Sequence, residues 1–120
     1  ASQNIIKELN ELGFSKILGH NFNFFEPDYQ VEIPESSAIF TVNALEQVGE
    51  NYKDFINFLL YKKPDLCINF EPMPELLDST KLLDKLCIKY SEKRNYLKGY
   101  LPYLEQLESE GKIEIILKVL

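Results

Sequence analysis

The stretch Ala38-Ile-Phe-Thr-Val-Asn-Ala-Leu-Glu-Gln-Val-Gly49 decides how this chain folds. Its first five residues, Ala38 to Val42, form a continuous apolar run that is rich in β-branched side chains. Such runs are typical of strands that are covered on both faces, as in parallel sheets. The polar residues that follow leave the strand, and Gly49 ends the segment. The stretch therefore predicts a buried strand of a parallel sheet with a short polar exit.

Helices and strands alternate on the carboxyl side of this strand. Tyr52 to Tyr61 places its apolar residues on one helical stripe, and Leu66 to Phe70 is a second strand of the buried type. Helical spacing then runs from Leu82 to Leu107, where Pro102 must kink or interrupt the helix because it lacks a backbone donor. Ile113 to Leu120 is predicted as the last strand.

On the amino side, Gln3 to Leu12 has helical spacing and Gly13 is a natural stop. Phe14 to Phe25, dense in aromatic residues, is predicted as a further strand. Strands that alternate with amphipathic helices are typical of α/β proteins. We therefore expect a single domain over residues 1–120, with a mostly parallel sheet flanked by helices in three layers.

Composition excludes several classes of protein. The chain has 120 residues, of which 45% are hydrophobic and 27% charged, so a real core is expected and disorder is not. The net charge of −6 predicts no nucleic-acid partner and no binding to an anionic membrane surface. No apolar run approaches the roughly 18 to 20 residues of a membrane span. Cys67 and Cys87 are expected as two buried free thiols in the cytoplasm, with one disulfide as the alternative.

The residues and motifs that form common catalytic and metal-binding sites are scarce. His20 is the only histidine, and with two distant cysteines it does not form the ligand spacing of a zinc site, so no metal is expected. No nucleophile-elbow motif is present. The five glycines lie at least six positions apart, which excludes a P-loop and a G-x-G-x-x-G turn.

In parallel sheets, ligands bind beyond the carboxyl ends of strands. This rule selects three segments, 20–25, 43–47 and 69–72. The amides and rings of the first could hold a flat ring such as adenine, or could form the edge of the core. Asn43, Glu46 and Gln47 could face a ligand, or could cap a turn and lie in solvent. Asn69 must tie loops together or face a ligand, because a buried amide needs hydrogen-bond partners.

Glu71 and the charged face of the last helical region each allow two interpretations. Glu71 could be a carboxylate at the mouth of the site, although Glu-Pro-x-Pro more often marks only a strand exit. Glu92, Lys93 and Arg94, with neighbouring lysines, are expected to be a solvated helix face, with contact to an anionic group as the alternative.

The segment from Ala38 to Gly49 resembles the fourth strand and the following turn of class I S-adenosylmethionine-dependent methyltransferases. Tyr52 to Tyr61 and Leu66 to Phe70, which ends in Asn-Phe-Glu-Pro, resemble that family's next helix and fifth strand. Gln3 to Leu12 and Phe14 to Phe25 would be its second helix and third strand. The resemblance covers nearly the whole chain but only the carboxyl half of the family's domain. It extends, more narrowly, to bacterial methyltransferases linked to sugar or polysaccharide modification.

The resemblance implies a partial Rossmann-like fold that lacks the first strands. It implies transfer of a methyl group from S-adenosylmethionine to a small-molecule or sugar acceptor. Glu46 or Gln47 would face the acceptor, and His20 is a distant candidate base. The residues that it assigns to the cofactor are Asn23, Phe24, Asn43, Ala44 and Leu45. Because the family's glycine-rich loop and its ribose-binding acidic residue are absent, we expect the chain to be inactive on its own.

A second hypothesis is a non-catalytic α/β interaction module. A complete small enzyme of another chemistry is less favoured, because the nucleophile, metal-binding and phosphate-binding motifs that it would need are missing. In the methyltransferase family, two further strands separate the third strand from the fourth. Without them, the edge of the Ala38–Val42 strand is unpaired and can template pairing with another chain. We therefore expect either self-association through that edge or docking of the amino-terminal segment against it.

Overall fold

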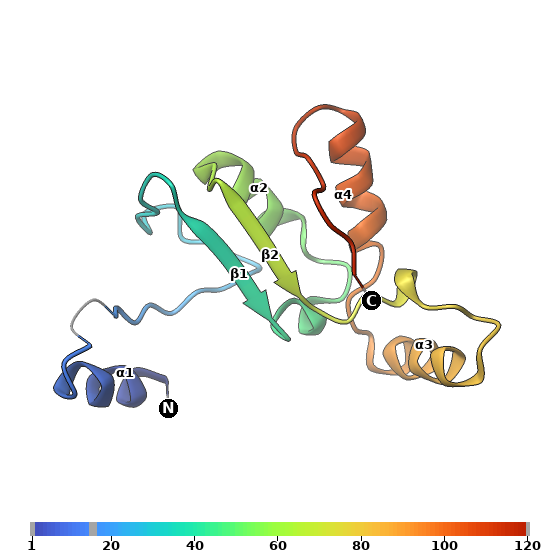
Figure 1. Cartoon of the computed structure of the whole chain (residues 1–120), viewed down its shortest axis with the longest axis horizontal. Coiled ribbons are helices and arrows are strands. Elements are labelled where there is room, and N and C mark those ends of the chain that lie inside the picture. Colours follow the sequence, from blue (N-terminus) through green and yellow to red (C-terminus); the bar gives the residue numbers. More distant parts are fainter. Residues whose placement is uncertain (1, 15–16, 120) are drawn as a thin grey trace.

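The fold is built around one β-α-β unit (Figure 1). The computed structural model describes residues 2–14 and 17–119. Strand β1 (Ala38–Val42) and strand β2 (Leu66–Phe70) are parallel, and helix α2 (Lys53–Lys62) connects them. The register pairs Ala38 with Leu66 at one end and Val42 with Phe70 at the other. Both strands are confirmed with the predicted bounds.

Three more helices and two short 3₁₀ turns complete the described residues: α1 (Ser2–Glu11), η1 (Leu45–Val48), η2 (Pro74–Leu76), α3 (Leu82–Arg94) and α4 (Tyr100–Ser109). The three-layer, mostly parallel sheet is wrong, because the sheet of the described residues has only two strands. The residues that the structure describes form a small α/β domain, without the larger sheet that a partial Rossmann-like fold requires.

Phe14–Phe25 is predicted as a strand, and residues 15–16 of it lie outside the described ranges. The rest of this segment is irregular, so the predicted strand is wrong there. Its rings pack against α2 instead. Phe24 meets Phe55 edge to face with 4.9 Å between ring centroids, and Phe22 lies 5.1 Å from Phe58. A strand requires a backbone partner, and this segment buries its aromatic side chains without one. It therefore does not dock as a strand on the free edge of β1.

The predicted strand Ile113–Leu120, whose last residue lies outside the described ranges, is also wrong. The backbone N–H of Ile115 donates to the Glu108 carboxylate (2.7 Å), and Lys118 pairs with Glu105. Both acceptors belong to α4, so the segment runs beside that helix in Figure 1. The segment thus contacts side chains of α4, whereas a strand would hydrogen-bond to the backbone of a neighbouring strand.

The long helix is interrupted before Pro102 and not by it. Asn95 and Gly99 both have positive φ angles, 54° and 74°, which separate α3 from α4. Pro102 is the third residue of α4. Helix N-terminal N–H groups have no partner within the helix, so the donor that proline lacks is not missed there. The expected kink at Pro102 is therefore wrong.

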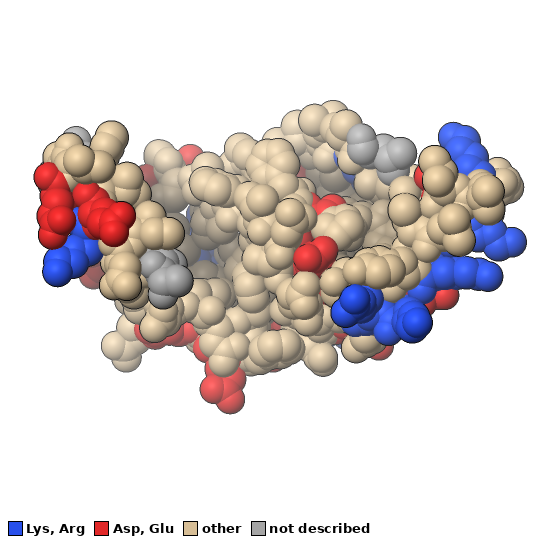
Figure 2. Space-filling model, turned by 90° about the horizontal axis from the view of Figure 1, so that it is seen from below, with Lys and Arg blue, Asp and Glu red and all other residues tan. Residues whose placement is uncertain are grey.

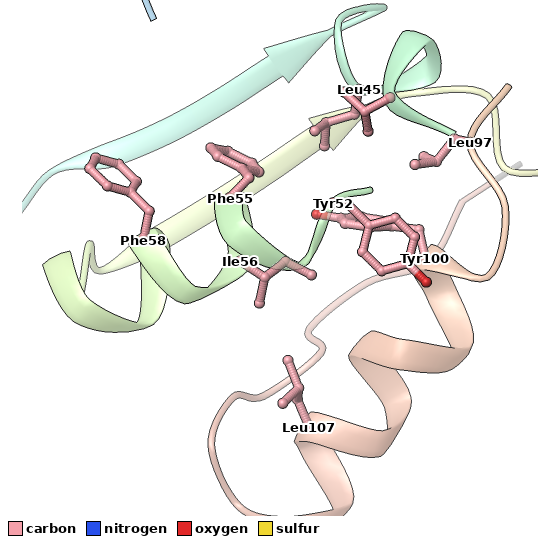
Figure 3. Packing of buried hydrophobic residues seen from close by; sticks show 9 residues of the cluster. Leu45, Tyr52, Phe55, Ile56, Phe58, Leu97, Tyr100 and Leu107 are labelled. Carbon is pink, nitrogen blue, oxygen red and sulfur yellow. The ribbon is translucent and has the colours of Figure 1, made fainter. Parts of the chain in front are cut away.

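The core lies on one side of the sheet, between α2, η1 and α4 (Figure 3). Leu45, Leu97 and Tyr100 are at most 1% exposed, and Phe55 of α2 is 3% exposed. These side chains come from four separate segments, so the core forms only when η1 and α4 dock on the β-α-β unit.

The opposite face of the sheet is uncovered in the described residues. Phe40, Val42 and Phe70 are 67%, 55% and 59% exposed. Ile39 and Thr41, which alternate with the outward residues of β1, point toward α2; Ile39 is half-buried and Thr41 is buried. In Figure 1 the two strands lie in front of α2 with no helix drawn over them. The expectation of strands covered on both faces is therefore wrong for this chain as it stands.

Helix α1 lies apart from this core (Figure 1). No α1 residue belongs to the described core cluster, and α1 instead approaches Gly19, where a Cβ atom would lie 2.6 Å from side-chain atoms of Gln3 and Ile6. The radius of gyration is 16.6 Å, against about 14 Å for a compact chain of this length. The molecule is therefore more extended than a single globule.

Candidate functional site

The carboxyl ends of β1 and β2 meet at one edge of the sheet, as the parallel topology requires. Beyond β1, Asn43 adopts a left-handed conformation with φ 47° and donates its N–H to the Phe70 carbonyl at 3.0 Å. This turn directs the chain into η1, whose residues Leu45 and Val48 are buried. The exit from β1 is thus held by β2 and by the core.

Glu71, directly after β2, holds this turn with its carboxylate. Its two oxygens accept the backbone N–H groups of Ala44 (3.1 Å) and Glu46 (3.2 Å). Hydrogen bonds from backbone donors to a carboxylate are stronger than neutral ones. The N–H groups that could have received an anionic ligand at this end are therefore already occupied by a side chain of the protein.

A second layer of contacts fixes the loop between α3 and α4 against the same end. Leu97 donates its N–H to the Glu46 carbonyl (3.0 Å), and Lys98 donates to Gly49 (3.2 Å). The Tyr52 hydroxyl donates to the Gly99 carbonyl at 2.7 Å. Burial, followed by the nearby charges of Glu75 and Glu50, raises the pKa of Tyr52. This hydroxyl therefore stays a donor at neutral pH.

A polar cluster lies under the covered face of the sheet. Thr41 donates its hydroxyl to the Asn69 side-chain oxygen (3.1 Å), and the Cys67 thiol lies 3.9 Å from the same oxygen. Burial raises the pKa of the Cys67 thiol and raises that of the nearby Tyr100 hydroxyl well above its usual range. Asn69 thus ties the two strands together.

A groove of about 520 Å³ opens beside the carboxyl ends, between Glu46, Pro72 and helix α3. Tyr90 and Tyr96 line it with their rings edge to face at 6.0 Å, and the Arg94 guanidinium lies 5.5 Å from the Tyr90 ring centroid. Figure 2 shows basic side chains gathered at the α3 end of the molecule. Those on α3, all exposed, are Lys85, Lys89, Lys93 and Arg94.

The predicted site residues fall into two groups. Asn43, Ala44, Leu45, Glu46 and Gln47 lie together at the carboxyl end of β1. Leu45 is completely buried, and the Glu46 carboxylate accepts the side-chain amide of Gln47 at the surface.

His20, Asn23 and Phe24 lie on the segment that packs against α2. The His20 ring is 3.5 Å from the Asp28 carboxylate, with both side chains about half exposed. The Asn23 side chain accepts the N–H of Phe25. Phe24 packs against the core cluster that includes Leu45, whereas the polar contacts given for His20 and Asn23 stay within their own segment.

Among the described residues, no group of three or more histidine, cysteine, aspartate or glutamate side chains could hold a metal ion. Cys67 and Cys87 are both free thiols, but Cys87 is exposed on α3 and Cys67 is half-buried, so the expectation of two buried thiols is wrong. None of the helices in the described ranges has the length and apolar character needed to cross a membrane.

Comparisons with known proteins return no match. No family model matches the chain, and no curated protein or solved structure is significantly similar to it.

Sequence reasoning missed two features of the strands and their exits. The double acceptor role of Glu71 has no local signal beyond the position of this residue directly after β2. The uncovered face of the sheet did have a signal, because the outward positions Phe40, Val42 and Ile68 are as apolar as the inward ones.

Proposed function

We propose that this chain is a non-catalytic interaction module that binds another protein through the uncovered face of its sheet. This bare sheet face consists of Ala38, Phe40, Val42, Leu66, Ile68 and Phe70, three from each strand. The observation that carries the proposal is that all six side chains are apolar and all six are exposed. Contiguous apolar surface of this kind marks interaction sites in soluble proteins.

The size of the face supports this function. Whole aromatic side chains present about 150–250 Å², so the five larger residues leave roughly 500 Å² of apolar surface in water. The largest apolar patch on a typical monomer is about 300–600 Å² and is often functional. No residue of the face can be charged, so covering it requires no desolvation of an ion.

The carboxyl end of the sheet is a weaker candidate for chemistry. Glu71 already occupies the N–H groups of Ala44 and Glu46, and Leu45 is sealed in the core. The module is proposed to work in the cytoplasm, where the exposed thiol of Cys87 stays reduced.

Photo-crosslinking in the cells that naturally make the protein tests this function. A photoreactive phenylalanine analogue replaces Phe40 on the face, and in a matched control it replaces Tyr61, which is 68% exposed at the end of α2. We expect a discrete crosslinked protein band from position 40 and none from position 61. Absence of any band from position 40 would contradict the proposal.

A methyltransferase-related role is the second candidate, in which S-adenosylmethionine would bind beside Glu46 and pass its methyl group to a small-molecule or sugar acceptor. Two observations favour it: the parallel pairing of β1 with β2, and a groove beyond their carboxyl ends that Glu46 lines. A carboxylate beside two tyrosine rings is suited to a cationic group such as a sulfonium.

Calorimetric titration with S-adenosylmethionine tests this second candidate. If the groove is the site, Glu46→Gln weakens binding, whereas Glu50→Gln does not, because Glu50 does not line the groove. An interaction module shows no heat of binding with either the unmodified chain or the variants.

A further inference from the structure

We propose that the partner at the bare sheet face is a second copy of this chain, bound sheet to sheet around a two-fold axis that runs parallel to the strands. This proposal rests on the interaction function and names its partner. It concerns the face of the sheet and is separate from pairing along the free edge of β1.

The area of the face meets the requirement of a weak dimer. Two copies that cover each other's face remove roughly 1,000 Å² in total from the five larger residues of each. Specific interfaces start at about 1,000–1,200 Å², and residues at the rim of the face add to this area. Each half of such an interface is supplied by the same surface, as a two-fold dimer requires.

The order of side chains on the face is self-complementary. The register forms three rows, Ala38 with Leu66, Phe40 with Ile68, and Val42 with Phe70. Each row pairs a smaller side chain on one strand with a larger one on the other. Because a two-fold axis along the strands and between them places β1 over β2 of the other copy, Val42 then faces the second copy's Phe70, and Ala38 faces its Leu66.

This arrangement interdigitates large and small side chains, as close packing between sheets requires. A two-fold axis across the strands is the alternative. It would place the Phe40 side chains of the two copies directly on each other and the two Ala38 side chains opposite Val42, which leaves a crowded centre and open corners. The row pattern therefore selects the axis along the strands.

Sedimentation equilibrium tests the partner. We expect the unmodified chain to be a dimer at high micromolar concentration. We expect Phe40→Glu to raise the dimer dissociation constant at least about tenfold, because a carboxylate would have to be buried without a partner. Val42→Asn is the milder second variant in case Phe40→Glu fails to fold, and Tyr61→Glu is the control that leaves the dimer unchanged. Circular dichroism verifies that each variant is folded.

Crosslinking with a short bis-maleimide tests the axis. Single-cysteine chains Val42→Cys and Phe70→Cys are prepared with Cys67→Ala and Cys87→Ser. Mixing the two is expected to produce the crosslinked dimer, and Val42→Cys alone produces it too, because residues of one row lie at the same height in both copies and neighbouring strands are only about 4.8 Å apart. Ala38→Cys mixed with Val42→Cys should give little crosslink between the two chains, because their rows lie about 13 Å apart along the strands. Crosslinking between Ala38→Cys and Val42→Cys chains, but not within Val42→Cys or with Phe70→Cys, would overturn the axis along the strands.

The result of photo-crosslinking at Phe40 separates the two proposals. A crosslink to the same chain supports both. A crosslink to a different protein, together with a purified chain that stays monomeric, overturns the second copy and leaves the interaction function intact. No crosslink and no dimer overturn both.

Discussion

Glu71 illustrates how one carboxylate can determine the shape of a potential binding site. Its oxygens accept the N–H groups of Ala44 and Glu46, and the same turn is held by the bond from the Asn43 N–H to Phe70. The β1 exit therefore depends on a residue that lies more than twenty positions later in the chain. A carboxylate is suited to this role because both of its oxygens are acceptors, whereas an amide has one acceptor and one donor group.

We expect Glu71→Gln to lower the free energy of unfolding by about 1–3 kcal/mol. The amide can satisfy only one of the two N–H groups, and its own NH₂ then faces the other. Urea denaturation measures the loss. Glu50→Gln is the matched control, because Glu50 is exposed and its ion pair with Lys98 at 3.9 Å is worth about 1 kcal/mol at most. Equal effects of the two substitutions would contradict the structural role of Glu71.

Tyr100 predicts how stability depends on alkaline pH. Burial raises the pKa of its hydroxyl above the ordinary value of 10.0, so the folded chain keeps a proton that the unfolded chain releases above that pH. The stability from this group is complete below pH 10 and is lost as the pH rises toward the folded-state pKa. The loss per pH unit in that window is about 1.4 kcal/mol for one group.

We therefore expect Tyr100→Phe to flatten the decline in the free energy of unfolding above pH 10, when measured by urea denaturation at several pH values. Tyr61→Phe, at an exposed position, is expected to keep the decline of the unmodified chain. A Tyr100→Phe curve parallel to that of the unmodified chain would show that the hydroxyl is not buried as described.

At the level of the elements, the sheet has one covered face and one bare face. Phe55 of α2 packs under the covered face and is 3% exposed, whereas Phe40 on the bare face is 67% exposed. Because both residues are phenylalanines, a comparison of the same substitution at the two positions isolates the effect of burial on stability. Phe55 also contacts Phe22 and Phe24, so it anchors the segment that precedes β1.

We expect Phe55→Ala to cost about 3–5 kcal/mol of unfolding free energy. Phe40→Ala should cost less than about 1 kcal/mol, when the chain is dilute enough to be monomeric. Thermal and urea denaturation measure both. Similar losses from the two substitutions would mean that the face of Phe40 is covered within one copy of the chain.

The elements also show what could be predicted from the sequence. Ala38–Val42, Leu66–Phe70 and the helix between them are locally encoded, because each has a continuous pattern bounded by turn residues. The segments 14–25 and 113–119 have strand-like patterns, but a strand exists only if another backbone pairs with it, which local sequence does not specify. The first segment packs against α2 and the second contacts α4 instead.

The candidate site was predictable to the same extent. The rule of carboxyl strand ends selects residues 43–47 as a ligand site, and the structure places them at the exit of β1. The contact of Glu71 with Ala44 depends on how two loops lie in space, and no local pattern indicates that. His20 lies on the neighbouring segment, whose rings pack against α2, and that docking is likewise not indicated by any local pattern.

At the scale of the whole molecule, the body formed by the β-α-β unit and α4 is distinct from α1. The overall extents are 50 × 34 × 25 Å, and the long dimension includes α1 at one end and α3 at the other (Figure 1). Ile5 and Leu12 of the amino-terminal segment are 57% and 76% exposed. A helix of ten residues without a buried face contributes little free energy to the fold.

We therefore expect removal of residues 1–14 to change the free energy of unfolding by less than about 1 kcal/mol. The radius of gyration, 16.6 Å in the full chain, should fall toward about 14 Å in small-angle X-ray scattering. Removal of residues 112–120 is the opposite case, because Ile113 packs against the core and its loss should lower stability. If the amino-terminal deletion were the more damaging of the two, α1 would have to dock on the body in solution. Its docking position would then be the bare sheet face, because Phe40, Val42 and Phe70 leave that side of the strands apolar and exposed.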